Sequence, residues 1–149
     1  MKLELKHIAP YLPYELKGYV EHTEELCTLH IRDGKNLLCS IDSFINGTYQ
    51  MKPILRPLSD LTKEIELNGE TVVPFEYFKN ECEDEYFTDT DFEQYLIDSI
   101  NPNVTNHHIR YLPFGLIQKL FEWHFDVFRL IEKELAIDIN TFQYENKNK

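Results

Sequence analysis

The side chains of this chain that could do chemistry are mostly carboxylates, and many of them are gathered in one segment. Eight acidic residues lie between Glu81 and Asp98 with no lysine or arginine among them, in a chain whose formal net charge is −11. The plain interpretation is a solvated surface. Aromatic residues are interleaved with these acids, as they are at protein-binding surfaces, so the segment also suggests an inhibitor that imitates nucleic acid on a basic partner. The candidate contacts are Glu83, Asp84, Glu85, Asp89 and Asp91. The same negative field disfavours direct binding of DNA or RNA.

No local pattern of histidines predicts a metal or catalytic site. His107 and His108 are adjacent and therefore point in different directions in most backbones. The sequence has no H-x-x-x-H spacing, which would place two ligands on one helical face, and no phosphate-binding loop or nucleophile elbow. We therefore expect no cofactor, no metal and no catalytic residue. The alternative, an enzyme or metal protein, needs a site assembled from distant groups such as these two histidines or buried carboxylates.

The three cysteines, Cys27, Cys39 and Cys82, form no C-x-x-C pair, and we interpret them as free thiols. The N-terminal residues alternate charged and apolar side chains, which is not the pattern of a signal peptide. No run of apolar residues approaches the length of a membrane span. These features predict a soluble, cytoplasmic protein with no membrane partner.

The first half of the chain has the pattern of an antiparallel β-meander. Short alternating segments separated by polar or glycine-bearing turns predict four strands, over residues 15–20, 25–31, 37–41 and 48–55. Residues 58–65 allow one or two helical turns, although Asn68-Gly69 could equally close a hairpin onto residues 71–73. Two short helices are expected next, over residues 75–82 and 91–100.

The strongest periodicity predicts a long helix from Pro113 to Leu135, followed by a short strand over residues 136–140. His124 lies on its apolar stripe, where a core histidine bonded to a backbone carbonyl is the favoured interpretation. Trp123 and Phe125 widen the apolar arc beyond what one sheet face would cover. A second layer, a partner protein or a second copy in a homodimer is therefore implied, and these two residues are candidate partner contacts.

Several segments together resemble a family of small uncharacterised proteins encoded by phages and prophages of anaerobic gut bacteria. They are HIAPYLPY at residues 7–14, KPILRPLSDLTKEI at 52–65, KLFEWHFDVF at 119–128 and LAIDIN at 135–140. Glu134 departs from the pattern, since a helix-ending glycine is expected there in that family. The resemblance implies a phage or prophage origin and a bacterial cytoplasm, and it brings no activity or site residues.

Taken together, the patterns predict a single α+β domain over residues 1–144 with a frayed tail at 145–149. The domain would combine an N-terminal antiparallel meander with short helices and a long C-terminal helix. A non-enzymatic protein-interaction module with an unknown protein partner is the favoured function. An acidic mimic of nucleic acid and an enzyme or metal protein are the alternatives.

Overall fold

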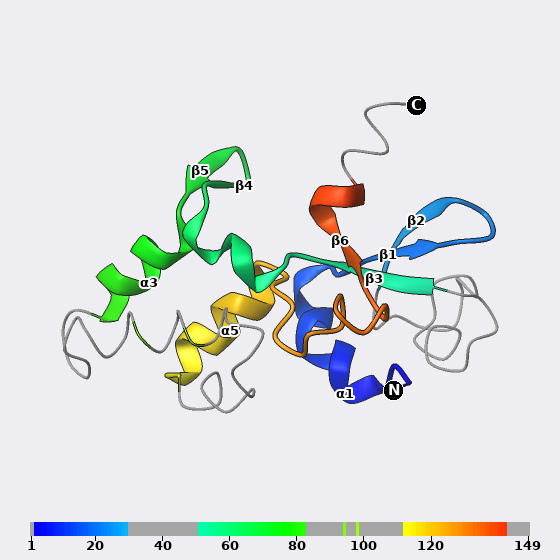
Figure 1. Ribbon diagram of the computed structural model, residues 1–149, viewed down its shortest axis with the longest axis horizontal. Helices are drawn as coiled ribbons and strands as arrows, with labels where there is room; N and C mark the ends of the chain where they lie inside the picture. Colours follow the sequence, from blue (N-terminus) through cyan, green and yellow to red (C-terminus); the bar gives the residue numbers. More distant parts are fainter. Residues whose placement is uncertain (1, 30–50, 83–93, 95–97, 99–111, 143–149) are drawn as a thin grey trace. The chain divides into compact units, whose positions relative to one another are not determined.

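The chain, seen here in a computed structural model, divides into two compact units (Figure 1). Unit 1 comprises Met1–Pro57 and Leu120–Lys149, and unit 2 comprises Leu58–Lys119. The structure describes residues 2–29, 51–82, 94, 98 and 112–142. The expected strand at 37–41 and the expected tail lie outside these ranges, and the single domain stays a prediction. The expected α+β class is confirmed, with helices and two separate sheets.

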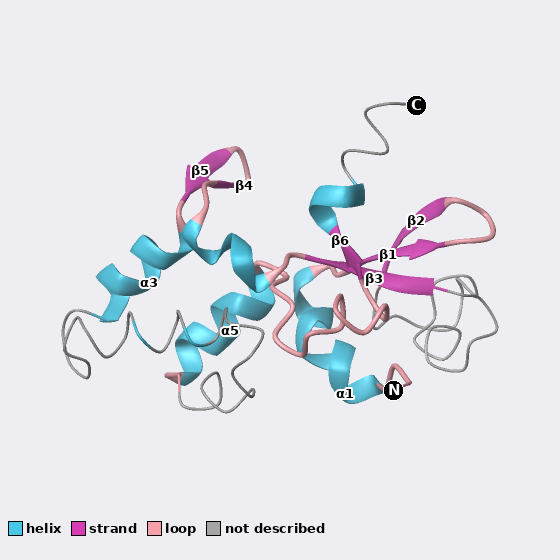
Figure 2. Ribbon diagram, in the orientation of Figure 1, coloured by secondary structure: helices cyan, strands magenta, loops and turns pink. Residues whose placement is uncertain are grey.

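Unit 1 is built on a four-stranded sheet in the order β2-β1-β3-β6 (Figure 2). Its strands are β1 (Lys17–Val20), β2 (Glu25–Thr28), β3 (Met51–Leu55) and β6 (Ile137–Asp138). The antiparallel meander at the N-terminus is confirmed, and β3 pairs with β1 on the side opposite β2. The predicted return of the chain as a strand after residue 136 is also confirmed, although β6 runs parallel to β3.

A glycine allows β1 and β3 to approach closely. A Cβ atom at Gly18 would lie 3.0 Å from the Met51 sulfur and 3.4 Å from the Cys27 sulfur. Both sulfur atoms therefore occupy the space that any larger residue would need. Cys27 is a reduced cysteine, as expected, and its thiol donates to the Gly18 carbonyl at 3.5 Å.

The N-terminal residues form helical turns that the sequence analysis did not anticipate. They are α1 (Leu5–Ile8) and the 3-10 helix η1 (Ala9–Tyr14), which ends at Glu15 in a left-handed conformation with φ 57°. The buried members of these turns join the core of unit 1. That core consists of Leu3, Ile8, Tyr11, Leu12, Leu16, Val20, Leu29, Met51, Leu55, Leu130 and Ala136.

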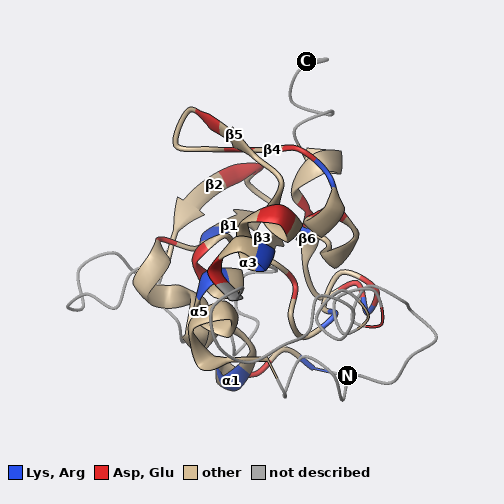
Figure 3. Ribbon diagram, turned by 90° about the vertical axis from the view of Figure 1, so that its left-hand side faces the viewer, with Lys and Arg blue, Asp and Glu red and all other residues tan. Residues whose placement is uncertain are grey.

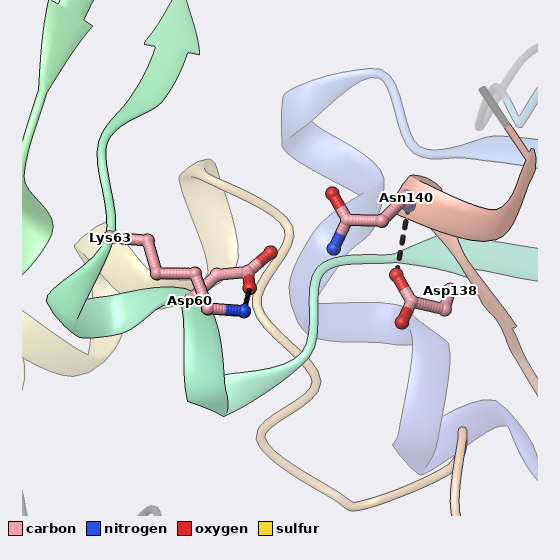
Figure 4. Close-up of polar contacts among 4 residues, drawn as sticks. All are labelled: Asp60, Lys63, Asp138 and Asn140. Atoms are coloured by element: carbon pink, nitrogen blue, oxygen red, sulfur yellow. Dashed lines mark hydrogen bonds and ion pairs between the residues drawn. The ribbon is translucent and has the colours of Figure 1, made fainter. Parts of the chain in front are cut away.

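Unit 2 contains both structures that the sequence allowed, helical turns after residue 58 and a hairpin closed by Asn68-Gly69. A 3-10 helix, η3 (Leu58–Thr62), is followed by a hairpin of β4 (Ile65–Leu67) and β5 (Glu70–Val72), and then by α3 (Pro74–Cys82). Asn68 and Gly69 make the hairpin turn with φ values of 53° and 85°, as a two-residue type I′ turn requires. The buried carboxylate of Asp60, in η3, accepts a 2.7 Å bond from the ammonium of Lys63, the residue that follows this helix (Figure 4). Of the expected helix at 91–100, the described residues Gln94 and Asp98 are helical.

The long helix predicted from Pro113 to Leu135 is wrong, because α5 (Phe114–Glu122) ends after nine residues. His124 adopts a left-handed φ of 58°. Its amide donates to the Phe121 carbonyl at 3.0 Å, and the Phe125 amide donates to the Leu120 carbonyl at 2.8 Å. These two bonds form a Schellman motif, which ends a helix and satisfies its last carbonyl groups. A second chain reversal of the same kind occurs at Glu134, with φ 58°.

Candidate functional site

The acidic contacts predicted from the sequence lie outside the described residues. They are Glu83, Asp84, Glu85, Asp89 and Asp91. Two acids at the borders of this segment are described. Glu81 is exposed near the end of α3, and the Asp98 carboxylate accepts a 2.8 Å bond from the Gln94 amide. The acidic binding surface therefore stays a prediction.

The negative charge is concentrated in one of the two units. Unit 2 contains thirteen acidic and four basic residues, a net charge of −9, whereas unit 1 contains thirteen and eleven, a net charge of −2. Figure 3 colours the acidic residues of the described elements red along the ribbon. Because the β4–β5 hairpin and α3 both expose carboxylates, the charge of unit 2 is not restricted to the segment that the sequence singled out.

The two aromatic candidates for partner contact occupy different environments. Phe125 is completely buried, and its amide donates to the Leu120 carbonyl where α5 ends. A buried ring cannot provide a contact surface, so its assignment as a partner contact is corrected to a core position. Trp123, two residues earlier, is half-buried and keeps part of its ring accessible.

The segment after α5 is held by a set of buried polar side chains, of which Tyr11 is the most enclosed. Its hydroxyl donates to the Phe125 carbonyl at 2.7 Å and accepts from the Val127 amide at 3.2 Å. Its ring packs edge-to-face on Phe121 with centroids 4.9 Å apart. Burial, reinforced by the negative charge of Asp126, holds the pKa of Tyr11 well above its usual range. The phenol therefore stays protonated and keeps its donor role.

Asp126 organises the turn that follows. Its carboxylate is 4% exposed and accepts bonds from the Leu130 amide at 2.8 Å and the Ile131 amide at 2.7 Å. Its own amide donates to the Arg56 carbonyl at 2.8 Å. Burial raises the pKa of Asp126, and the two amide bonds oppose that shift because they favour the carboxylate. The carboxylate thus satisfies donors that would otherwise be buried without acceptors.

His124 is bonded to a backbone carbonyl, which confirms the sequence interpretation. Its Nε2 lies 2.7 Å from the Tyr14 carbonyl oxygen. A carbonyl can only accept, so Nε2 carries the proton. Burial, followed by the positive charges of Arg56 and Lys17, lowers the pKa of His124, although the bond to Tyr14 opposes this. The ring is therefore a neutral donor that ties the end of α5 to η1.

His7 has a comparable role at the N-terminus. Its Nδ1 accepts a 3.0 Å bond from the Glu4 amide, and its own amide donates to the Glu4 carbonyl at 2.9 Å. The ring is 3% exposed and meets Phe128 edge-on at 5.7 Å between centroids. Burial, with help from the charge of Lys6, lowers the pKa of His7 and keeps the ring neutral.

The hydrogen-bond partners of these buried polar side chains limit the chemistry that the side chains can perform. The bonds described above from Tyr11, Asp126, His124 and His7 all go to backbone groups. A general acid or base must instead reach a substrate proton. In the ranges that the structure covers, no three side chains of histidine, cysteine, aspartate or glutamate are grouped to hold a metal ion. His107 and His108, the distant candidates, lie outside those ranges.

Sequence reasoning anticipated only part of this cluster. Asp126 lies within the long helix predicted from Pro113 to Leu135 and was not selected as a core residue, whereas the structure buries it. Sequence reasoning did not select Tyr11, because a tyrosine in a proline-rich segment carries no signal of a buried hydrogen bond to residues far along the chain. The sequence offers one signal for Asp126, a charged residue within an apolar stretch. A charged side chain there is costly to bury unless it has hydrogen-bond partners.

Comparisons with known proteins leave the family of this chain open. Neither a family model, nor a curated protein, nor a solved structure matches it. Among the described residues, no helix combines the length and apolar character needed to cross a lipid bilayer.

Proposed function

We propose that this chain is a non-enzymatic protein-interaction module of phage or prophage origin that acts in the bacterial cytoplasm. The observation that supports it best is the exposure of Phe114. This ring, on the first turn of α5, is 74% exposed, more than the other large apolar side chains noted at the surface, Leu26 at 56% and Leu5 at 48%. An exposed aromatic side chain is a typical anchor for a protein partner, because binding removes its apolar area from water.

The buried polar groups also support a role without catalysis. Tyr11, His124 and Asp126 each direct their polar atoms at backbone groups of unit 1. Such bonds stabilise a fold and leave these atoms poorly available to a substrate. The enzyme or metal alternative would use His107, His108 or buried carboxylates, and the two histidines lie outside the described ranges.

A photo-crosslinking amino acid placed at position 114 tests the proposal in host cells. The matched control carries the same probe at Leu26, the exposed apolar position of β2. We expect one discrete adduct from position 114 and none from position 26, and the adduct should disappear when an unlabelled competitor is in excess. An adduct with a second copy of the chain would identify a homodimer. No adduct at position 114 would refute Phe114 as an anchor.

The charge of unit 2 favours a second candidate, the acidic inhibitor that imitates nucleic acid. Its net charge of −9 would attract a basic, nucleic-acid-binding surface. The test replaces Glu83, Asp84, Glu85, Asp89 and Asp91 by their amides and measures binding of the partner at several salt concentrations. Loss of binding in this variant, with a steep salt dependence in the parent, would favour the inhibitor. Unchanged binding would favour the contact through Phe114.

A further inference from the structure

We propose that Asn68 is a site of spontaneous modification, at which the side-chain amide is lost and the residue becomes aspartate or isoaspartate. The reacting groups are adjacent in the chain. The electrophile is the Asn68 side-chain carbon, and the nucleophile is the backbone nitrogen of Gly69. Glycine leaves this nitrogen unusually accessible because it has no Cβ.

The reaction consumes one water molecule and needs no enzyme or oxidant. The Gly69 nitrogen bonds to the side-chain carbon of Asn68 as it loses its proton. The bond to the side-chain nitrogen then breaks, ammonia leaves and a succinimide ring remains. Water opens the ring at either carbonyl carbon. Opening at the main-chain carbonyl gives isoaspartate, and opening at the side-chain carbonyl gives aspartate.

The structure presents this pair without steric protection. Asn68 and Gly69 are both exposed at the tip of the β4–β5 hairpin. No atom outside the immediate chain lies within 4 Å of the position that a Cβ would take on Gly69. The register pairs Leu67 with Glu70, so the bonds that close the hairpin belong to these residues and not to the Gly69 nitrogen. Water and the attacking nitrogen therefore both have access.

The hairpin is short enough to open without unfolding the whole protein. Each strand has three residues, and the sheet has two strands. A two-stranded hairpin is marginal in water, so its turn can reach the cyclisation geometry through local opening. Because the turn must open before Asn68 can cyclise, the reaction should be slower in the protein than in a free peptide. The difference should be modest, because this opening costs little.

The two products would affect unit 2 differently. Aspartate tolerates the left-handed conformation of position 68, so the turn would persist with one more negative charge near Glu66 and Glu70. Isoaspartate adds a methylene group to the main chain. The two-residue turn would then no longer fit the pairing of Leu67 with Glu70, and the hairpin would lose its register.

Timed incubation of the intact protein in mildly alkaline and mildly acidic buffer tests the proposal. Peptide mapping by mass spectrometry should find a gain of about one dalton at residue 68. The gain should form faster in the alkaline buffer, where the Gly69 nitrogen loses its proton more readily. Electron-transfer fragmentation would separate the two products. Asn80, exposed in α3 and followed by Glu81, is the internal control and should keep its amide.

A synthetic peptide of residues 64–73 gives the rate at which Asn68 loses its amide in an unfolded segment. We expect Asn68 of the protein to react within about tenfold of the peptide rate, because local opening of so short a hairpin costs little. An Asn68 that keeps its amide while the peptide converts would overturn the proposal, since the turn would then be protective. Equal conversion of Asn80 would also overturn it, because the turn would confer no selectivity. An Asn68→Gln variant should lose the signal at residue 68.

Discussion

Replacing Tyr11 by phenylalanine tests the central inference about unit 1, that the Tyr11 hydroxyl helps to hold the segment after α5 against η1. The phenylalanine ring keeps the edge-to-face contacts with Phe121 and Phe128, at 4.9 and 6.4 Å between centroids. The substitution removes only the bond donated to the Phe125 carbonyl and the bond accepted from the Val127 amide. It therefore isolates the hydrogen bonds from the packing.

The expected cost follows from those two bonds. Each buried hydrogen bond contributes about 0.5 to 1.5 kcal/mol net, and buried partners left without a bond add to the loss. One partner is partly compensated, because the Val127 amide also lies 2.9 Å from the Phe125 carbonyl. We therefore expect Tyr11→Phe to lower the free energy of unfolding by about 2 kcal/mol.

Urea unfolding followed by tryptophan fluorescence measures this loss in the correct unit, because Trp123 is the only tryptophan and belongs to unit 1. Tyr19→Phe is the matched control. Tyr19 is half-buried and also meets a ring edge-on, that of Phe142 at 5.3 Å. Its variant should change the free energy of unfolding by less than about 0.5 kcal/mol. Equal effects of the two variants would refute the reasoning.

Three further predictions, on His124, Glu134 and Phe125, concern the turns and the core. Unit 1 should lose stability as pH falls below about 6.5, because the lowered pKa of His124 means that the unfolded chain binds more protons there. The melting temperature should depend less steeply on pH in His124→Asn, because among the described histidines only His7 would keep a pKa lowered by burial. An unchanged pH dependence would argue against the assignment. Glu134→Gly should stabilise by about 0.5 to 1 kcal/mol in urea unfolding, since φ is 58° at this position. Glu132→Gly, in the same turn without a positive φ, should destabilise, and similar effects of the two would contradict the explanation. Phe125→Ala should cost about 3 to 5 kcal/mol and Phe114→Ala less than about 0.5 kcal/mol, and the reverse order would contradict their assigned burial.

The elements predicted correctly are those that short-range patterns specify. Alternation over residues 15–20 and 25–31 identified β1 and β2, and the Asn68-Gly69 pair identified the turn of the second hairpin. The position of His124 among apolar residues predicted a bond to a backbone carbonyl, and the bond to Tyr14 confirms that partner, although the residue is half-buried. The strands and the turn depend on residues only a few positions away in the chain. For His124, the expectation required only that some backbone carbonyl accept its bond.

The end of α5 could not be predicted in this way. Apolar residues continue with helical spacing past Glu122, and no glycine marks a stop. The chain instead places His124, Arg129 and Glu134 in left-handed conformations, each of which costs a non-glycine residue about 1 to 2 kcal/mol. Helix propensities differ by only a few tenths of a kcal/mol per residue, so tertiary contacts can override them.

By itself, the sequence determined the α+β class, the strongly acidic charge, the meander strands and the Asn-Gly turn, because these depend on composition and on neighbours along the chain. The tertiary structure alone decided where α5 ends and which side chains become buried after it. The bonds responsible join Tyr11 to Phe125 and Tyr14 to His124, residues separated by 114 and 110 positions. Contacts at such separations form only when the chain is folded, so no pattern of neighbouring residues reveals them.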